Sequence, residues 1–207
     1  MTAGPRLVVA TTNRHKLREI RGILDGLGIA VDGLDAFALV PEPEETGRTF
    51  AENARQKAVY YSAALGMPVV AEDSGLEIDG LDGAPGVQSA RYGGPAAAAY
   101  EQKFALVFAG LRERGAMGSP ARFVCALAVA DGDRVLFEAR GVIEGRISDA
   151  PAGAGGFGYD PIFFYPPLGK TLAQLDEIEK AGVSHRARAF RQLRDRLAAA
   201  PGLVGGP

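Results

Sequence analysis

The first third of the chain alternates between a short apolar run and an amphipathic stretch. Residues 6–10 form an apolar run that predicts a buried strand, and the polar turn after it ends in Asn13, which can cap a helix. Leu17, Ile20 and Leu24 then recur at helical spacing. A strand, a polar turn and a helix in this order predict an α/β fold.

The middle of the chain continues the alternation. Thr49 stands three residues before Glu52, a capping-box spacing that predicts a helix running to Ala64. The apolar run after this helix predicts a short strand that ends at Ala71. The polar residues 72–75 are then expected to leave the strand, with a short extended piece directly after them.

The second half of the chain favours one long helix and a hairpin. A helix is expected over residues 95–114, and the apolar stretches 122–130 and 134–143 are separated by Asp131-Gly132, which is typical of a β-hairpin. The remaining expected elements are a glycine-rich loop at 153–158, a strand at 161–165 and a last helix capped by Ser184. Together these patterns predict a mixed α/β protein.

Length and composition suit a single domain over residues 1–207, with a frayed tail from about residue 201. No run of 18 apolar residues and no signal-peptide pattern is present, so we expect a cytoplasmic protein without a membrane partner.

The 23 basic and 25 acidic residues argue against a binder of nucleic-acid polymers, although a local basic pocket remains possible. The single cysteine, Cys125, excludes an internal disulfide and is expected to be a buried structural thiol.

Basic residues crowd the first turns of two predicted helices, where positive charge opposes the helix dipole. Arg14, His15 and Lys16 begin the first helix, and His185 and Arg186 begin the last. Each such charge costs about 0.3–1 kcal/mol. A bound anion, most often phosphate, would offset that cost. A solvated basic face is an equally good interpretation of the charge pattern alone.

Acidic residues supply a second chemical feature. Glu42, Glu44 and Glu45 lie in a predicted loop, whereas Glu72 and Asp73 lie at the expected end of a strand. Carboxylates brought together repel unless a cation or a raised pKa relieves them, and Mg²⁺ binds carboxylates together with phosphate oxygens. With the basic residues, this indicates nucleotide or phosphoester chemistry. Solvated glutamates and an ordinary turn aspartate are the alternatives.

Two stretches resemble phosphate-binding motifs, but the residues around them exclude both motifs. Gly153 to Gly158 has the spacing of the dinucleotide fingerprint, but Asp160-Pro161 and a strand follow where a helix is required. Gly169-Lys170-Thr171 resembles the end of a P-loop, but Phe164 stands where its first glycine would be.

Ordered blocks between about positions 7 and 195 resemble the inosine triphosphate pyrophosphatase family, also called Ham1-like proteins. The blocks are ATTNRHK (10–16), EETG (44–47), FAENA (50–54) with Lys57-Ala58, EDSGL (72–76), GAPG (83–86), SARY (89–92), GGFGYDP (155–161), Glu179-Lys180 and SHR (184–186). Each block is weak alone, but the ordered set is specific. The resemblance implies a long central mixed β-sheet flanked by helices, two lobes around a substrate cleft, and a homodimer.

The resemblance also implies an activity. Members of this family use Mg²⁺ to hydrolyse ITP, dITP and XTP to the monophosphate and pyrophosphate, which clears deaminated purines from the nucleotide pool. Asp73 would be the general base, Lys16 would act on the triphosphate, and Glu45 and Asp73 would hold Mg²⁺. The implied substrate-binding residues are Thr11, Thr12, Asn13, Arg14, His15, Lys16, Lys57, Ser74, Phe157, Gly158, Tyr159, Asp160, Lys180, His185 and Arg186.

Two departures from the family pattern and two alternatives stay open. Glu72 stands where the family commonly has aspartate, which leaves its role open, and Thr12 stands where glycine is frequent. The alternatives are a related pyrophosphatase for other modified nucleotides and a nucleotide-binding module without catalysis. The presence of Lys16, Glu45 and Asp73 argues against the second, since a pure sensor needs no base.

Overall fold

The chain forms two compact units, each with an apolar core of its own. The computed structural model describes residues 5–37, 40–97 and 99–200. Unit 1 is built from residues 1–73, 125–141 and 185–207. Unit 2 is built from residues 74–124 and 142–184. The tail expected to fray from about residue 201 lies outside the described residues.

Seven strands hydrogen-bond in the order β2-β1-β3-β4-β5-β6-β7. Their bounds are β1 Arg6–Val9, β2 Ala30–Gly33, β3 Val69–Ile78, β4 Pro120–Asp131, β5 Arg134–Ile147, β6 Phe163–Tyr165 and β7 Lys170–Thr171. Strand β1 runs parallel to β2 and β3, whereas β6 runs antiparallel to β5 and β7. The predicted α/β class with a mixed sheet is therefore confirmed.

The described residues also form five α-helices. Their bounds are α1 Arg14–Leu24, α2 Phe50–Leu65, α3 Tyr100–Glu113, α4 Glu177–Val183 and α5 His185–Ala199. Within this described part of the chain, no helix is both long enough and apolar enough to cross a membrane.

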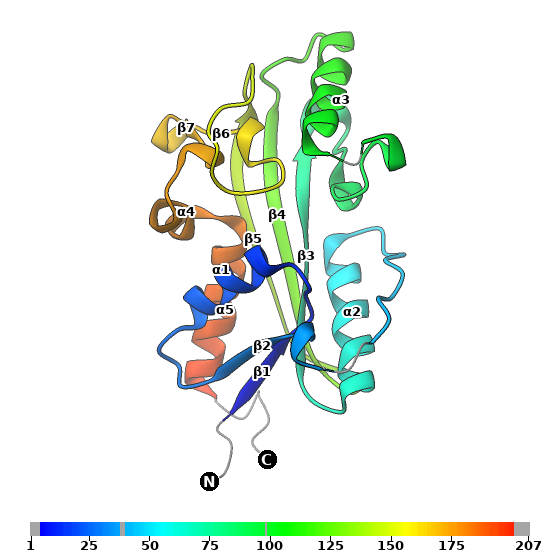
Figure 1. The fold of residues 1–207 in the computed structure, drawn as a ribbon, viewed down its shortest axis with the longest axis vertical. Helices are drawn as coiled ribbons and strands as arrows, with labels where there is room; N and C mark the ends of the chain where they lie inside the picture. The colour runs from blue at the N-terminus through cyan, green and yellow to red at the C-terminus, as the bar shows by residue number, and fades with distance from the viewer. Residues whose placement is uncertain (1–4, 38–39, 98, 201–207) are drawn as a thin grey trace. The chain divides into compact units, whose positions relative to one another are not determined.

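The core of unit 1 lies where α1 and α5 pack on the strands. The predicted spacing of Leu17, Ile20 and Leu24 is confirmed, since all three are buried on α1. They share an apolar cluster with Phe190 and Leu193 of α5. Helices α1 and α5 lie on one side of the strands of this unit and α2 lies on the other (Figure 1). Strands covered on both faces are apolar at successive positions, which explains the continuous run in β1.

Local hydrogen bonds fix the starts of α1 and α2 as the sequence predicts. The side chain of Asn13 accepts hydrogen bonds from the backbone N–H groups of His15 and Lys16. Thr49 and Glu52 form the reciprocal capping box that their spacing predicts. The caps therefore set the register in which each helix presents its inner face.

Strand β3 differs from its prediction. Residues 72–75 do not leave the strand after Ala71 but continue a single strand from Val69 to Ile78. Because side chains alternate along a strand, Glu72 and Asp73 point to opposite faces of the sheet. The expectation that both carboxylates lie together at a strand end is therefore wrong.

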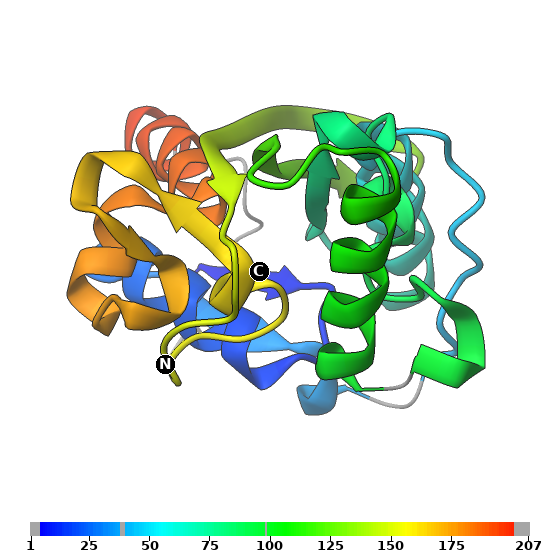
Figure 2. The same cartoon turned by 90° about the horizontal axis from the view of Figure 1, so that it is seen from above.

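Unit 2 is centred on α3 and the strands packed against it. Phe104, Val107 and Leu111 bury the apolar face of α3 in the core of this unit, as predicted. The helix begins at Tyr100 rather than at residue 95, because Gly94–Ala97 form a separate 3₁₀ helix. Figure 2 shows the loop that precedes β6, in yellow, running between α3 and the strands β6 and β7.

Candidate active site

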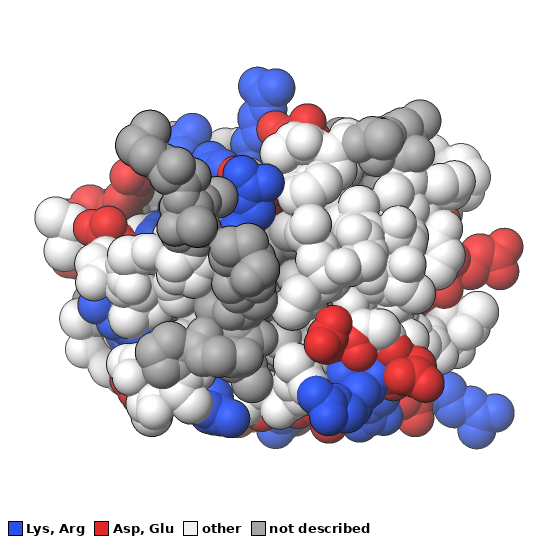
Figure 3. Space-filling model, turned by 90° about the horizontal axis from the view of Figure 1, so that it is seen from below, with Lys and Arg blue, Asp and Glu red and all other residues white. Residues whose placement is uncertain are grey.

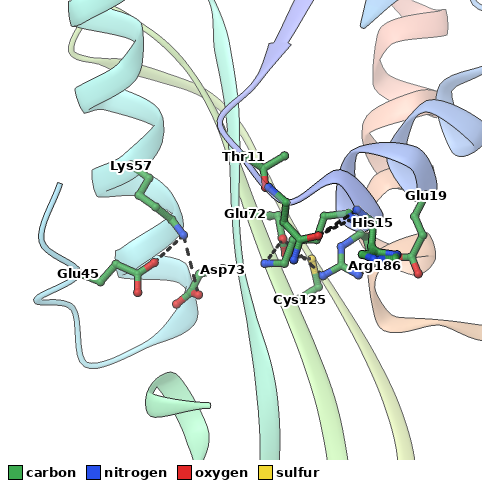
Figure 4. A network of polar contacts seen from close by, with 11 residues as sticks. Thr11, His15, Glu19, Glu45, Lys57, Glu72, Asp73, Cys125 and Arg186 are labelled. Carbon is green, nitrogen blue, oxygen red and sulfur yellow. Dashed lines mark hydrogen bonds and ion pairs between the residues drawn. The ribbon is translucent and has the colours of Figure 1, made fainter. Parts of the chain in front are cut away.

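Strand β3 places the two neighbouring carboxylates of unit 1 in different surroundings. Figure 4 shows Asp73 with Lys57 and Glu45 on one side of the strand, and Glu72 with Cys125 and Arg186 on the other. Glu72 is 3% exposed and Asp73 is 7% exposed, so each needs partners within the protein.

Helix α2 and the loop before it provide the partners of Asp73. Asn53 donates a hydrogen bond from Nδ2 to Oδ2 of Asp73 at 2.9 Å. Lys57 lies one turn further along α2, with Nζ 4.0 Å from Oδ1 of Asp73 and 2.7 Å from Oε1 of Glu45. The ammonium of Lys57 therefore bridges two carboxylates that the sequence places 28 positions apart.

This arrangement favours proton acceptance by Asp73. Burial raises the pKa of Asp73, and although Lys57 and the hydrogen bond from Asn53 oppose this, the net pKa is higher than usual. Burial alone would lower the pKa of Lys57, but the charges of Asp73 and Glu45 outweigh it and raise that pKa. A carboxylate with a raised pKa beside a lysine that stays protonated is a suitable general base.

The opposite face of β3 holds an ion-pair network around Glu72. Lys16 of α1 lies with Nζ 2.5 Å from Oε1 of Glu72, and Arg186 of α5 lies with Nη2 3.4 Å from the same oxygen. Arg186 also pairs through Nη1 with Oε2 of Glu19 at 2.7 Å. Cys125, buried as predicted, donates its thiol to Oε2 of Glu72 at 3.3 Å.

The charges of this network assign Glu72 a role that the sequence leaves open. Burial alone would raise the pKa of Glu72, but Arg186 and Lys16 hold it well below its usual range. Burial raises the pKa of Cys125 well above its usual value, and the charge of Glu72 adds to this. Glu72 is therefore a counter-ion for α1 and α5, with a lowered pKa, whereas Asp73, with a raised pKa, is the better proton acceptor.

The ion pairs account for two of the basic residues at the helix starts. Lys16 in the first turn of α1 and Arg186 in the first turn of α5 are both compensated by Glu72. The N–H groups of His15 and Lys16 donate to Asn13, and the hydroxyl oxygen of Thr11 accepts from the N–H of Asn13 at 3.1 Å. For Lys16 and Arg186, the cost of opposing the helix dipole is thus offset by Glu72.

Unit 2 holds the predicted residues of the glycine-rich loop. Oδ2 of Asp160 accepts a hydrogen bond from the backbone N–H of Phe157 and one from Nζ of Lys180, both at 2.8 Å. The same Nζ lies 4.4 Å from the centre of the Phe157 ring, a cation–π contact. Gly156 has a φ of 68°, and a Cβ there would overlap Oδ2 of Asp160, so only glycine fits this turn.

The carboxylates of Glu45, in the loop before α2, and of Asp73, on β3, fit a magnesium ion. Glu45 and Asp73 are hard oxygen donors of the kind that Mg²⁺ takes together with phosphate. The charge of Glu45 contributes to the raised pKa of Asp73, and a cation would relieve that repulsion. Among the described residues, no cluster of three or more His, Cys, Asp or Glu side chains could hold a metal ion. Mg²⁺ commonly takes one or two protein carboxylates and fills its other positions with water and phosphate oxygens.

The family model for the Ham1 family matches residues 7–196. The chain belongs to the Ham1 family.

Two relatives named dITP/XTP pyrophosphatase are similar over most of their length. The protein from Exiguobacterium sp. is 48% identical over 192 residues, which cover 93% of this chain and 96% of the relative. A protein from Thermus thermophilus is 45% identical over 195 residues, which cover 93% of this chain and 92% of the relative.

Solved structures of Ham1 proteins share the fold. The structure of a HAM1 protein from Coxiella burnetii has a TM-score of 0.88 and 39% identity, and the match covers 95% of this chain and all of that one. The dITP/XTP pyrophosphatase structure from Mycobacterium abscessus has a TM-score of 0.72 and 37% identity, with 91% of this chain and 98% of that one covered.

In this Ham1-family chain the predicted site residues fall in both units. Unit 1 contains Thr11, Thr12, Asn13, Arg14, His15, Lys16, Glu45, Lys57, Asp73, His185 and Arg186. Unit 2 contains Ser74, Phe157, Gly158, Tyr159, Asp160 and Lys180. The structure brings Glu45, Lys57 and Asp73 together, but it places Lys16 beside Glu72 rather than beside Asp73. Glu42 and Glu44 are exposed, as the solvated interpretation of that loop predicts.

Sequence reasoning misses Asn53 as a site residue of this Ham1-family chain. The FAENA block contains it, but its partner Asp73 lies 20 positions later and the direction of its side chain is not visible in the sequence. Its spacing of four from Lys57 is the signal that could have found it, because residues four apart in a helix share one face.

Proposed function

We propose that this chain hydrolyses dITP, ITP and XTP to the nucleoside monophosphate and pyrophosphate. The observation that carries the proposal is the cluster of Asp73, Lys57 and Glu45, which joins a buried base to a positive charge and an oxygen ligand. The names of relatives in the same family support the substrate class.

Asp73 would take the proton from the attacking water. Its raised pKa makes it a stronger base than an exposed carboxylate, and the hydrogen bond from Asn53 holds it in place. A positioned base of this kind orients water for in-line attack on the α-phosphorus. The α–β phosphoanhydride bond then breaks, and pyrophosphate leaves with the electron pair.

Lysine side chains would stabilise the charge that moves onto the leaving pyrophosphate. Lys57 lies beside Asp73 and Lys16 lies in the first turn of α1, and both carry the positive charge that such a transition state needs. Thr11, Thr12, Asn13, Arg14 and His15 would add phosphate contacts at the start of α1. His185 would do so at the start of α5, where Arg186 is buried and paired with Glu72 and Glu19.

Mg²⁺ would be held by Glu45 and Asp73. When bound, it supplies positive charge to the phosphate oxygens and lowers the electrostatic cost of the leaving group. Asn53 and Lys57 keep the two carboxylates in place on the protein side.

The purine would be recognised in unit 2. Phe157 offers an aromatic face, and Lys180 offers an ammonium that can only donate. A donor suits the 6-oxygen of hypoxanthine and xanthine but mismatches the 6-amino group of adenine, which can discriminate strongly. Ser74, Gly158, Tyr159 and Asp160 would line this part of the site.

The proposal also includes a single functional domain over residues 1–207, a homodimer and a cytoplasmic location.

The test is product analysis with Mg²⁺ on dITP and XTP beside dATP and dGTP. We expect monophosphate and pyrophosphate from dITP and XTP, with much slower turnover of the other two. Release of orthophosphate, or equal turnover of all four, would contradict the proposed function. Tight nucleotide binding without turnover would favour a non-catalytic module, and turnover of other modified nucleotides alone would favour the related pyrophosphatase.

A further inference from the structure

Asn53 is a buried asparagine that joins three parts of unit 1. It lies on α2 and is 1% exposed. Its Nδ2 donates to Oδ2 of Asp73 on β3 at 2.9 Å, and its Oδ1 accepts from the backbone N–H of Gly47 at 2.8 Å. One amide group therefore connects the loop that carries Glu45 to the strand that carries Asp73.

The orientation of this amide is determined by its partners. A backbone N–H can only donate, so the amide oxygen must face Gly47. An ionised carboxylate can only accept, so the amide nitrogen must face Asp73. Because both ends are satisfied in one orientation alone, the side chain is fixed rather than free to flip.

A second bridge runs parallel to the first. Lys57, four residues after Asn53, contacts Oε1 of Glu45 and lies 4.0 Å from Oδ1 of Asp73. The two bridges thus hold different oxygens of the Asp73 carboxylate and reach the same loop, one at Glu45 and one at Gly47. A Cβ on Gly47 would lie 2.5 Å from Oδ1 of Asn53, so the loop approaches this amide as closely as glycine allows.

We propose that Asn53 is a positioning residue that fixes the plane of the Asp73 carboxylate relative to the loop 45–47. The role rests on the proposed function, because the carboxylate it positions is the base of that reaction. Without Asn53, the carboxylate can rotate about its Cβ–Cγ bond and the loop loses its anchor. Misplacement of a catalytic group by about 1 Å can cost about 100-fold in rate.

A double-mutant cycle tests this role. We expect Asn53→Ala to lower kcat for dITP by about 10- to 100-fold while KM changes by less than about threefold. In an Asp73→Asn background, the same substitution should change the residual kcat by less than about twofold, because Asn53 acts through Asp73. If the fall in kcat of the double variant equals the product of the falls in the two single variants, the inference is overturned.

Ser62→Ala is the matched control, and Asn53→Ser is the second variant if Asn53→Ala fails to fold. Ser62 is another fully buried polar residue of α2, which donates to the carbonyl of Met67 and accepts from the N–H of Gly132. Its loss should lower stability and leave kcat unchanged. An equal fall of kcat in the Ser62 and Asn53 variants would reduce Asn53 to a structural role.

NMR of the side-chain amide of Asn53 tests the positioning role without measuring turnover. In the wild-type protein, the side-chain amide signals of Asn53 should exchange slowly with water and shift in the Asp73→Asn variant. Amide signals that exchange as fast as those of exposed asparagines would overturn the inference whatever the activity. A wild-type protein that shows the protected signals but does not turn over dITP or XTP would overturn the proposed function instead.

Discussion

Two adjacent carboxylates of strand β3 have pKa values shifted in opposite directions, because their surroundings differ. Glu72 and Asp73 are both buried carboxylates, yet the pKa of Glu72 is held well below its usual range and that of Asp73 is raised. For Glu72, two cations outweigh burial, whereas for Asp73 burial outweighs one lysine and one amide. The sequence identifies both residues, but it cannot give the faces they occupy, because that depends on whether the strand continues through position 73.

At this scale we predict that Glu72 is needed for folding stability. Glu72→Gln leaves Arg186, which is 1% exposed, with Glu19 as its remaining counter-ion, and breaking a buried pair costs about 3–5 kcal/mol. The measurement is urea unfolding. The matched control is Glu138→Gln, which breaks the exposed pair with Arg55 and should cost no more than about 1 kcal/mol. Equal losses of unfolding free energy in the two variants would contradict the role of Glu72 as a counter-ion for α1 and α5.

The elements that the sequence predicts best are those whose signals are local. The capping box of Thr49 and Glu52 and the hairpin turn after residue 130 depend on a few residues, and the structure confirms the capping box and the hairpin. The turn itself is displaced by one residue, because Asp131 ends β4 and Gly132-Asp133 lie between the strands. The sequence predicts strand β3 too short, because its polar residues find partners on α1, α2 and α5 that are distant in sequence. Helix α4 and strands β2 and β7 are short, and their few residues carry no clear periodicity.

At the scale of elements, the close contact between β5 and α5 depends on the absence of a side chain at one glycine. A Cβ on Gly141 would overlap the carbonyl oxygen of His185 and lie 2.6 Å from the backbone nitrogen of Ala189, so α5 can pack here only against glycine. We expect Gly141→Ala to lower the free energy of unfolding by about 1–3 kcal/mol, since backbone atoms must move. The displacement would begin at His185, and activity should fall as well.

Gly22→Ala is the control for this prediction. Gly22 lies within α1, and a Cβ added there would meet nothing within 4 Å, so alanine should raise stability by about 0.4–1 kcal/mol. Thermal and urea unfolding of both variants give the comparison. A Gly141→Ala protein as stable and active as the wild type would show that α5 is free to shift along β5.

For the molecule as a whole, charge is distributed without a dominant sign. The net charge is −2, and on the face drawn in Figure 3 basic and acidic side chains lie interspersed rather than in one area of a single sign. Recognition of an anionic substrate must then depend on individual residues. The two units differ in what they offer, since unit 1 supplies Lys16, Lys57 and carboxylates, whereas unit 2 supplies Phe157 and Lys180.

This division leads to a prediction about separate contributions to substrate binding. Phe157→Ala should weaken inhibition by dIMP, which carries the base and one phosphate, by about tenfold, because loss of one aromatic stacking partner costs about 1–3 kcal/mol. It should leave inhibition by inorganic triphosphate nearly unchanged. Lys16→Ala should do the reverse, because it would remove the proposed phosphate contact and leave the proposed purine contacts in unit 2. The measurement is competitive inhibition of dITP hydrolysis at low ionic strength, where charge contacts are least screened. If both substitutions weakened both inhibitors equally, base and phosphate recognition would not be divided between the two units.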